Sequence, residues 1–237
     1  MGWLLIPILS AMLAGCGGSG GVVGSPRLAP GTYRGAENWR TGFLAGVTIP
    51  IVAVVLPGNH FAYSDLGAPG GLPYNGAAIF PLAPDAHGAF SARVEQGVFP
   101  AGTIPAGVVS GQNRPNAVPQ LSGAIRMDTG DEASWSLTRQ AGQGHPLEGL
   151  YVGTFAGPAS GPVILMVGSD GVVILLRGPA GRWDETAVGR AAAATGALSF
   201  DNVNPGAALA GAIAGGAASG TYTFAGVGSG TWAAAKQ

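Results

Sequence analysis

The chain has 237 residues with a formal net charge of -1 at pH 7, and only 10% of its residues are charged. This low and balanced charge offers no basic surface for nucleic acid, so no nucleic-acid partner is expected. The 43 glycines and 18 prolines interrupt long helices, and the one cysteine excludes an internal disulfide framework and a cysteine-rich metal site.

An apolar segment, residues 4–14, opens the chain and has the length of the hydrophobic region of a signal peptide. It is too short to span a bilayer as a helix, which takes about 20 residues. The segment ends at Leu13, Ala14, Gly15 and Cys16, and these four residues resemble the lipobox of bacterial lipoproteins. The resemblance implies that residues 1–15 are a signal peptide and that Cys16 is lipidated. A signal peptide with an incidental cysteine, or a buried apolar segment, is the alternative.

Residues 16–30 are predicted to be the lipidated cysteine and a tether, because glycine and serine follow Cys16 and make a flexible chain. Such a protein has the membrane as its partner, through a lipid anchor at Cys16. The lipoprotein resemblance also implies that Gly17, in place of an aspartate, directs the protein to the outer membrane.

An internal repeat divides the remaining chain into a first β repeat, residues 31–140, and a second, residues 149–237. Five blocks occur in the same order in both: 31–35 with 149–153, 51–63 with 163–175, 88–92 with 196–200, 121–125 with 209–213, and 134–137 with 221–224. Residues 97–120 carry four prolines and are predicted to be a loop inserted in the first repeat. Chance alignment of sequence rich in glycine and alanine is the alternative.

Turn residues between apolar runs predict β-hairpins in both repeats. Asp170 and Gly171 separate the runs 163–168 and 172–176, and Pro57-Gly58-Asn59 is the counterpart in the first repeat. The continuously apolar runs indicate strands that are buried on both faces. We therefore predict an all-β fold, an antiparallel meander of about ten to twelve strands that forms a small barrel or sandwich and is internally duplicated.

The lipobox, the tether and the Gly-x-Tyr-x-Gly strands at 31–35 and 149–153 together resemble the β-barrel lipoproteins of Gram-negative envelopes. The rhythm of the strands is similar to the barrel lobes of transferrin-binding-protein-like surface lipoproteins, and no ligand-contacting residue is carried over from them. A membrane-spanning barrel is the less favoured alternative. Its strands alternate apolar and polar residues over about nine to eleven positions, whereas the runs 163–167 and 172–176 of this chain are continuously apolar.

The polar residues of the sequence form no recognised catalytic or metal-binding pattern. His60, His87 and His145 have no recognised ligand spacing, and no metal or cofactor is expected. The acid pairs 131–132 and 184–185 lie in Gly-rich turns and are interpreted as solvated loop tips rather than an acid/base pair. Aromatic residues near turns could form the floor of a ligand site, although core packing is favoured: Trp39, Tyr63, Tyr74 and Trp183.

These observations predict a lipid-anchored envelope protein with a structural or binding role and no catalysis. The alternative is a lipocalin-like carrier that holds a small apolar ligand inside a β-barrel. The partner would be a protein or a small apolar ligand, and the sequence does not identify it. A hydrolase has no motif in its favour.

Overall fold

The computed structural model describes residues 28–67, 77–94, 107–114, 116–117, 120–142, 144–158, 160–178, 185–203, 207–224 and 228–237. These residues form sixteen antiparallel strands and no helix, so the all-β prediction is confirmed. The number of strands exceeds the ten to twelve expected. The predicted signal peptide, Cys16 and the tether as far as residue 27 lie outside the described residues.

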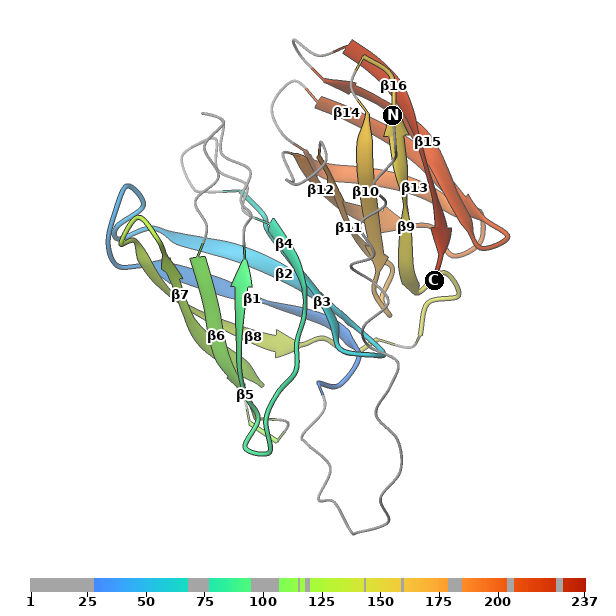
Figure 1. Cartoon of the computed structure of the whole chain (residues 1–237). Helices are drawn as coiled ribbons and strands as arrows, with labels where there is room; N and C mark the ends of the chain where they lie inside the picture. The colour runs from blue at the N-terminus through green and yellow to red at the C-terminus, as the bar shows by residue number, and fades with distance from the viewer. Residues whose placement is uncertain are drawn as a thin grey trace, which may run out of the picture.

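Lobe 1 is a curled eight-stranded sheet built by the first half of the chain (Figure 1). Its order is β4-β3-β2-β1-β8-β7-β6-β5, so β4 and β5 are the two edges. The strands are β1 (Gly31–Trp39), β2 (Thr48–Leu56), β3 (His60–Asp65), β4 (Ala77–Pro81), β5 (Ala89–Val94), β6 (Gly107–Asn113), β7 (Leu121–Met127) and β8 (Glu132–Arg139).

Lobe 2 is a closed eight-stranded barrel in which every neighbouring pair is antiparallel and β16 returns to pair with β9. Closure leaves this sheet without an exposed edge. The strands are β9 (Gly149–Ala156), β10 (Gly161–Val167), β11 (Val172–Arg177), β12 (Glu185–Ala191), β13 (Ala197–Val203), β14 (Ala207–Ala214), β15 (Ala217–Phe224) and β16 (Gly228–Lys236).

The two lobes pack against each other through the outer faces of equivalent hairpins. Side chains alternate across a strand, so one set of residues on β2 faces the interior of lobe 1 and the other set faces lobe 2. The interface cluster has ten buried residues: Val52, Val54, Leu56, Ala62, Ala77, Met166, Val172, Ile174, Leu176 and Val188. This sheet-on-sheet contact explains why the apolar run of β11 is buried on both faces, as predicted; in β10, for which the same was predicted, Ile164 is only partly buried. The run of β2 is likewise buried on both faces.

One hydrogen bond joins the turn of lobe 2 to the opening strand of lobe 1. The hydroxyl of Thr32 donates to Oδ1 of Asp170, and the same oxygen accepts the backbone N–H of Val172. Asp170 therefore shapes its own hairpin turn and also links the two lobes. Gly171, next in the turn, has a φ of 79°, which an L side chain rarely adopts.

Strand register confirms the internal duplication. Tyr33 pairs with Ala53, which pairs with Tyr63; Tyr151 pairs with Leu165, which pairs with Leu175. Each opening tyrosine also donates its hydroxyl to the carbonyl four residues earlier, at 2.7 Å from Tyr33 and 2.9 Å from Tyr151. The β2–β3 and β10–β11 hairpins therefore occupy equivalent places in the two lobes.

The last two predicted block alignments are wrong by one strand. Gly123 pairs with Trp135, whereas Gly220 pairs with Trp232, so Trp135 corresponds to Trp232 and not to a residue of 221–224. For the same reason, residues 121–125 correspond to 218–222 rather than to 209–213. The error arose because 121–125 and 209–213 share the letters Leu-x-Gly-Ala-Ile, although they lie on different strands of the duplicated sheet.

The prediction that residues 97–120 leave the sheet as a loop is also wrong in part. Residues 107–113 form β6, which pairs with β5 on one side and β7 on the other. The prolines at 105 and 115 flank this strand rather than interrupt it, so they remove no donor from its ladders. Residues 97–106 lie outside the described part of the chain.

In both lobes a tryptophan lies across two glycines on neighbouring strands. A Cβ on Gly111 would lie 2.6 Å from the ring of Trp135, and one on Gly211 would lie 2.5 Å from the ring of Trp232. A Cβ on the adjoining Gly123 would lie 2.6 Å from the Cα of Gly111, and one on Gly220 would lie 2.7 Å from the Cα of Gly211. Glycine is required at Gly111 and Gly211 because the indole occupies the space of the missing side chain, and at Gly123 and Gly220 because backbone atoms of the neighbouring strand lie closest.

No helix in the described part of the chain has the length and apolar character that crossing a membrane would require.

Candidate functional site

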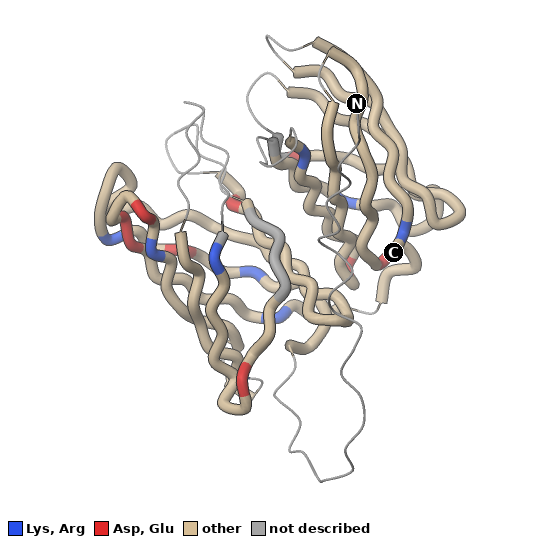
Figure 2. Tube along the Cα trace, in the orientation of Figure 1, with Lys and Arg blue, Asp and Glu red and all other residues tan. Residues whose placement is uncertain are grey.

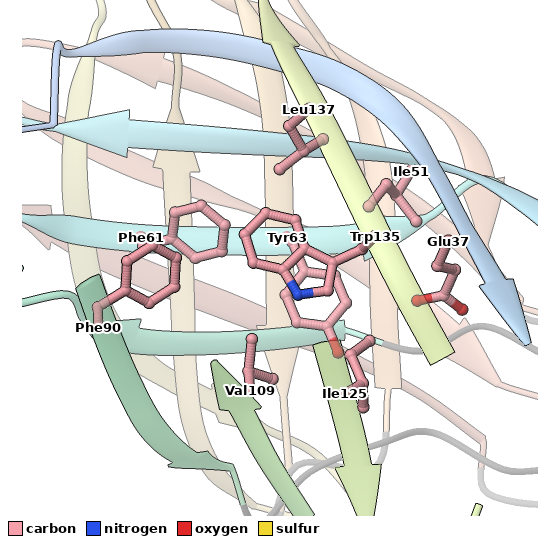
Figure 3. A pocket seen from close by; sticks show the side chains of 9 residues that line it. All are labelled: Glu37, Ile51, Phe61, Tyr63, Phe90, Val109, Ile125, Trp135 and Leu137. Atoms are coloured by element: carbon pink, nitrogen blue, oxygen red, sulfur yellow. The ribbon is translucent and has the colours of Figure 1, made fainter. Parts of the chain in front are cut away.

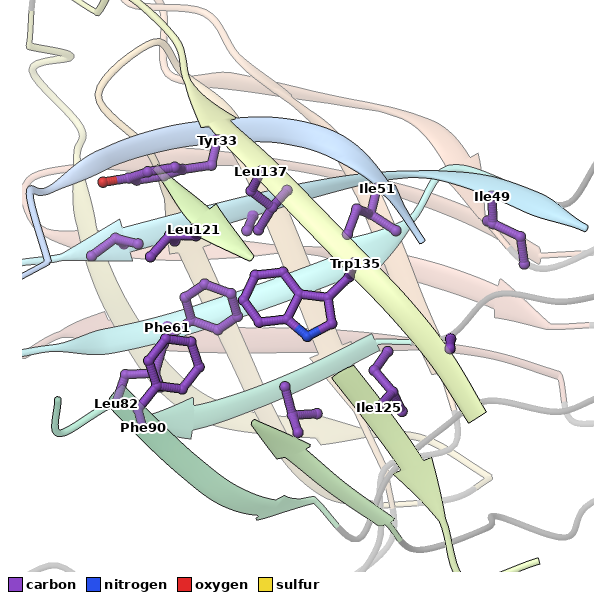
Figure 4. Close-up of a cluster of buried hydrophobic side chains, with 14 of the residues drawn as sticks. Tyr33, Ile49, Ile51, Phe61, Leu82, Phe90, Leu121, Ile125, Trp135 and Leu137 are labelled. Carbon is purple, nitrogen blue, oxygen red and sulfur yellow. The ribbon is translucent and has the colours of Figure 1, made fainter. Parts of the chain in front are cut away.

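The interior of lobe 1 contains a small cavity with an apolar lining (Figure 3). The cavity measures about 10 Å³, which is room for one water-sized group. Nine residues line it: Glu37, Ile51, Phe61, Tyr63, Phe90, Val109, Ile125, Trp135 and Leu137. Most of them also belong to the buried core of the lobe (Figure 4). The exceptional member is Glu37, an acid inside an apolar cluster.

Glu37 is buried because strand alternation places it on the same face of β1 as Tyr33 and Trp39. Its side chain is 1% exposed, and its Oε1 accepts a hydrogen bond of 2.6 Å from Nε1 of Trp39. Burial raises the pKa of Glu37 to about 7, and the hydrogen bond from Trp39 opposes part of that rise. The carboxyl group therefore changes charge near neutral pH.

Four aromatic rings surround the cavity. The ring centroids of Phe61 and Tyr63 are 6.4 Å apart, and those of Phe90 and Trp135 are 5.9 Å apart. Burial raises the pKa of Tyr63 well above its usual value, and the negative charges of Glu37 and Asp65 raise it further. Tyr63 thus stays a neutral hydrogen-bonding group beside two buried acids.

The described sheet of lobe 1 does not close into a barrel. Among the described residues, β4 pairs only with β3 and β5 pairs only with β6, so the two strands share no ladder. We call this gap between β4 and β5 the seam. Phe90 lies on β5, so the seam runs along the strand that supplies one wall of the cavity.

Lobe 2 fills the equivalent space differently. By register, Phe155 stands where lobe 1 has Glu37, and Arg177 stands where lobe 1 has Asp65. Arg177 is 4% exposed, and its Cζ lies 4.6 Å from the ring centroid of Phe155 and 3.8 Å from that of Phe224. The barrel therefore encloses its own cation against aromatic rings.

The three histidines are dispersed. His60 lines a groove of about 430 Å³ beside the β2–β3 turn, together with Glu148 and Lys236. His87 lies in the turn before β5, where the carboxylate of Asp85 accepts its backbone N–H at 2.8 Å. His145 precedes β9, and its Nδ1 accepts the N–H of Leu147 at 3.3 Å. The described residues contain no cluster of three or more potential metal ligands.

The acidic pairs and the aromatic candidates named from the sequence lie in different parts of the chain and do not come together in one site among the described residues. Asp131 and Glu132 lie at the β7–β8 turn, where Arg126 pairs with Glu132 at 3.3 Å. Trp39 belongs to the buried core of lobe 1 and Tyr63 packs against it. Tyr74, Trp183 and Asp184 lie outside the described residues, as does Cys16.

Sequence reasoning missed Glu37 and Asp65 as interior residues. A signal was present for Glu37: in the run Gly31–Trp39 the odd positions carry Tyr33 and Trp39, so alternation also turns residue 37 inward. No such signal exists for Asp65, because it ends a strand that is buried on both faces.

Charged residues are sparse on both lobes and mix the two signs (Figure 2). No protein-family model matches the chain, and no curated protein matches it. The candidate site therefore depends on the geometry of lobe 1 and on its contrast with lobe 2.

Proposed function

We propose that this chain is a lipid-anchored protein of the bacterial outer membrane, with a binding or structural role and without catalysis. The observation that carries the anchor is the run Leu13, Ala14, Gly15 and Cys16 between an apolar segment and a Gly-rich tether. Acyl chains on Cys16 would contribute about 0.8 kcal/mol for each buried methylene, which is sufficient for durable attachment when several chains are present. The binding role is supported by the polar groups inside lobe 1.

The anchor is tested by replacing the acceptor thiol. In cells fed with labelled palmitate, the wild-type chain should carry label and sediment with outer membranes. The Cys16→Ser chain should carry no label and leave the membrane fraction. Ser19→Ala, which alters the tether and keeps the four-residue run, is the matched control and should behave as the wild type. Identical fractionation of the wild type and Cys16→Ser would exclude the anchor.

A second candidate function is that of a lipocalin-like carrier, favoured by the apolar lining of the lobe 1 cavity. The cavity has room for one water-sized group, so an apolar ligand would have to part β4 and β5 at the seam. N-phenyl-1-naphthylamine, which brightens in apolar surroundings, tests this idea. Its fluorescence should fall with Phe90→Ala and not with Leu198→Ala, the equivalent change in lobe 2. An equal response of both variants would count against a carrier.

A further inference from the structure

A groove of about 430 Å³ lies where the β2–β3 turn of lobe 1 meets the end of β16 in lobe 2 (Figure 1). Ligand pockets commonly measure about 300–1,000 Å³, so the groove has room for a small ligand. Apolar and polar side chains share its lining, among them Leu56, Pro57, Leu150, His60, Glu148 and Lys236.

Two of the polar side chains in the groove lie against glycines. A Cβ on Gly58 would lie 3.4 Å from Cδ2 of His60, and one on Gly149 would lie 2.5 Å from Cε of Lys236. Both glycines have positive φ, 88° for Gly58 and 153° for Gly149. The turn and the start of β9 thus leave room for the imidazole and for the lysine side chain at the wall of the groove.

The internal duplication shows that Lys236 is used differently from its counterpart in lobe 1. Lys236 pairs with Tyr151 and Arg139 pairs with Tyr33, so the two cations correspond. Arg139 donates from Nε and Nη2 to the carbonyl of Pro30, at 3.1 and 2.6 Å. The ammonium group of Lys236 has no hydrogen bond or ion pair within the part of the chain that the structure describes. It can therefore donate to a ligand.

The groove adjoins the point at which the tether reaches lobe 1. Leu28 and Pro30 line a second hollow, of about 390 Å³, which shares Leu56 and Pro57 with the groove. The chain from Cys16 to Leu28 spans at most about 40 Å when fully extended. An anchor at Cys16 would therefore hold the groove close to the lipid headgroups.

We propose that this groove binds the phosphoethanolamine headgroup of a lipid in the membrane that carries the anchor. Lys236 and His60 donate hydrogen bonds to the phosphate, and Glu148 accepts hydrogen bonds from the ammonium group of the same headgroup. The apolar part of the lining faces the glycerol. This inference rests on the proposed anchor, because the membrane to which Cys16 attaches the chain supplies the lipid.

The charges of the groove favour a zwitterion. Glu148 and Lys236 both line it and form no ion pair with each other. A ligand with an ammonium and a phosphate complements both charges, whereas a pure anion would meet the acid and a pure cation the lysine. The net charge of -1 gives the chain no general attraction to an anionic membrane surface.

The carboxylate favours a primary ammonium group over a quaternary one. Phosphocholine carries the same charges as phosphoethanolamine, and its ammonium has no N–H to donate to Glu148. Weak affinity is sufficient, because a short flexible tether maintains an effective concentration in the millimolar range.

The first test is calorimetric titration of the full chain, solubilised in a maltoside detergent, with three soluble headgroups. We expect glycerophosphoethanolamine to bind in the millimolar range or tighter. Glycerophosphocholine and glycerophosphate, which lack the N–H donors or the whole cation, should bind at least about tenfold more weakly. Absence of glycerophosphoethanolamine binding, or equal binding of either other compound, would overturn the proposal.

Variants locate the site. Lys236→Gln and Glu148→Gln should each weaken glycerophosphoethanolamine binding at least about tenfold, because each removes one of the two complementary charges. Arg190→Gln and Asp201→Asn, at exposed positions of lobe 2 outside the groove, are the matched controls and should leave binding unchanged. Unaltered affinity in either groove variant would also overturn the proposal.

Vesicles distinguish a lipid from a soluble compound with the same headgroup. The Cys16→Ser chain, which lacks the anchor, should sediment more with phosphatidylcholine vesicles that contain phosphatidylethanolamine than with pure phosphatidylcholine vesicles. Equal sedimentation, despite binding of the soluble headgroup, would overturn the lipid as the ligand.

The outcome is separable from that of the anchoring test. A millimolar contact dissociates when membranes are washed, so Cys16→Ser still leaves the membrane fraction of cells. Lys236→Gln should keep its palmitate label and its membrane fractionation while it loses headgroup binding. Conversely, failure of the anchor would leave the titration with soluble headgroups unchanged.

Discussion

Lobe 1 and lobe 2 follow one strand plan and differ in closure. The barrel of lobe 2 is complete because β12 pairs with β13, whereas the equivalent strands of lobe 1, β4 and β5, do not pair among the described residues. Both lobes keep the opening tyrosine, the equivalent hairpin and the tryptophan packed over two glycines. The shared features therefore specify the curled sheet, and the features in which the lobes differ decide whether that sheet closes into a barrel.

The bulk of the interior side chains is distributed differently in the two lobes. On β3 and β5, lobe 1 has Phe61, Tyr63 and Phe90 where lobe 2 has Val173, Leu175 and Leu198. The bulk of lobe 2 lies on the opposite side, where Phe155 and Tyr222 replace Glu37 and Ile125. We infer that these large interior rings hinder the pairing of β4 with β5.

Proline reinforces the opening. Pro81 ends β4 and has no backbone N–H to donate to a ladder with β5. Edge strands that carry proline are a common protection against unwanted pairing. Lobe 2 has no proline within β12 and can therefore complete its ladder.

The largest expected effect comes from the interface that the two lobes share. Ile174→Asp places a charge among fully buried side chains of both lobes and should lower the free energy of unfolding by about 4 kcal/mol or more. Urea unfolding followed by circular dichroism measures it. Ala210→Asp, at an exposed position of β14, is the control. If only one of two separate transitions shifted, the lobes would be independent folding units.

The second-largest expected effect is the pH dependence of stability that the buried Glu37 gives to the interior of lobe 1. The pKa of Glu37 is raised by burial to about 7 from 4.5, so its stabilising contribution is complete below pH 4.5 and is lost as pH rises through 7. A rise of this size corresponds to about 3 kcal/mol. Glu37→Gln should remove this pH dependence and make the protein more stable than the wild type at pH 8.

Urea midpoints at pH 5 and pH 8 measure this difference. Asp201→Asn, on the exposed face of lobe 2, should retain the wild-type dependence on pH. Parallel pH profiles for the wild type and Glu37→Gln would show that the buried acid does not titrate in this range.

Local patterns made much of the fold predictable. Asp170-Gly171 and Pro57-Gly58-Asn59 mark turns by their chemistry, and the structure has Gly58, Asn59 and Gly171 at positive φ. The apolar run of β11 indicated a strand covered on both faces, and the contact between lobes supplies the second cover. Each of these features is encoded within a few neighbouring residues.

Other features depend on residues far apart and were beyond reach of the sequence. The alignment of Trp135 with Trp232 requires knowing which glycines lie beneath each ring, and several glycine-containing strands fit equally well by composition. The candidate site was missed because Glu37 and Tyr63 become neighbours through the curl of the sheet. Closure depends on the summed bulk of interior side chains from many strands.

A smaller effect tests whether the tryptophan packing is equivalent in the two lobes. Gly111→Ala and Gly211→Ala each push a methyl group into an indole ring and should each cost about 1–3 kcal/mol. Combining Gly111→Ala with Trp135→Leu should recover part of that cost, because the smaller side chain makes room. Urea unfolding of the single and double variants gives the coupling energy. Strict additivity in lobe 1 would mean that the ring does not determine the glycine.

The smallest expected effect is a difference in amide hydrogen exchange at the seam, which involves no change in global stability. Amide hydrogens on an unpaired strand edge are open to solvent, whereas those in a closed barrel are held in ladders. Peptides covering β5 should therefore exchange with deuterium well before peptides covering β13, its equivalent in lobe 2. Hydrogen exchange followed by mass spectrometry makes the comparison within one sample, so no variant is required. Equal exchange of β5 and β13 in the free protein would mean that lobe 1 closes in solution, and the contrast between an open and a closed lobe would then be lost.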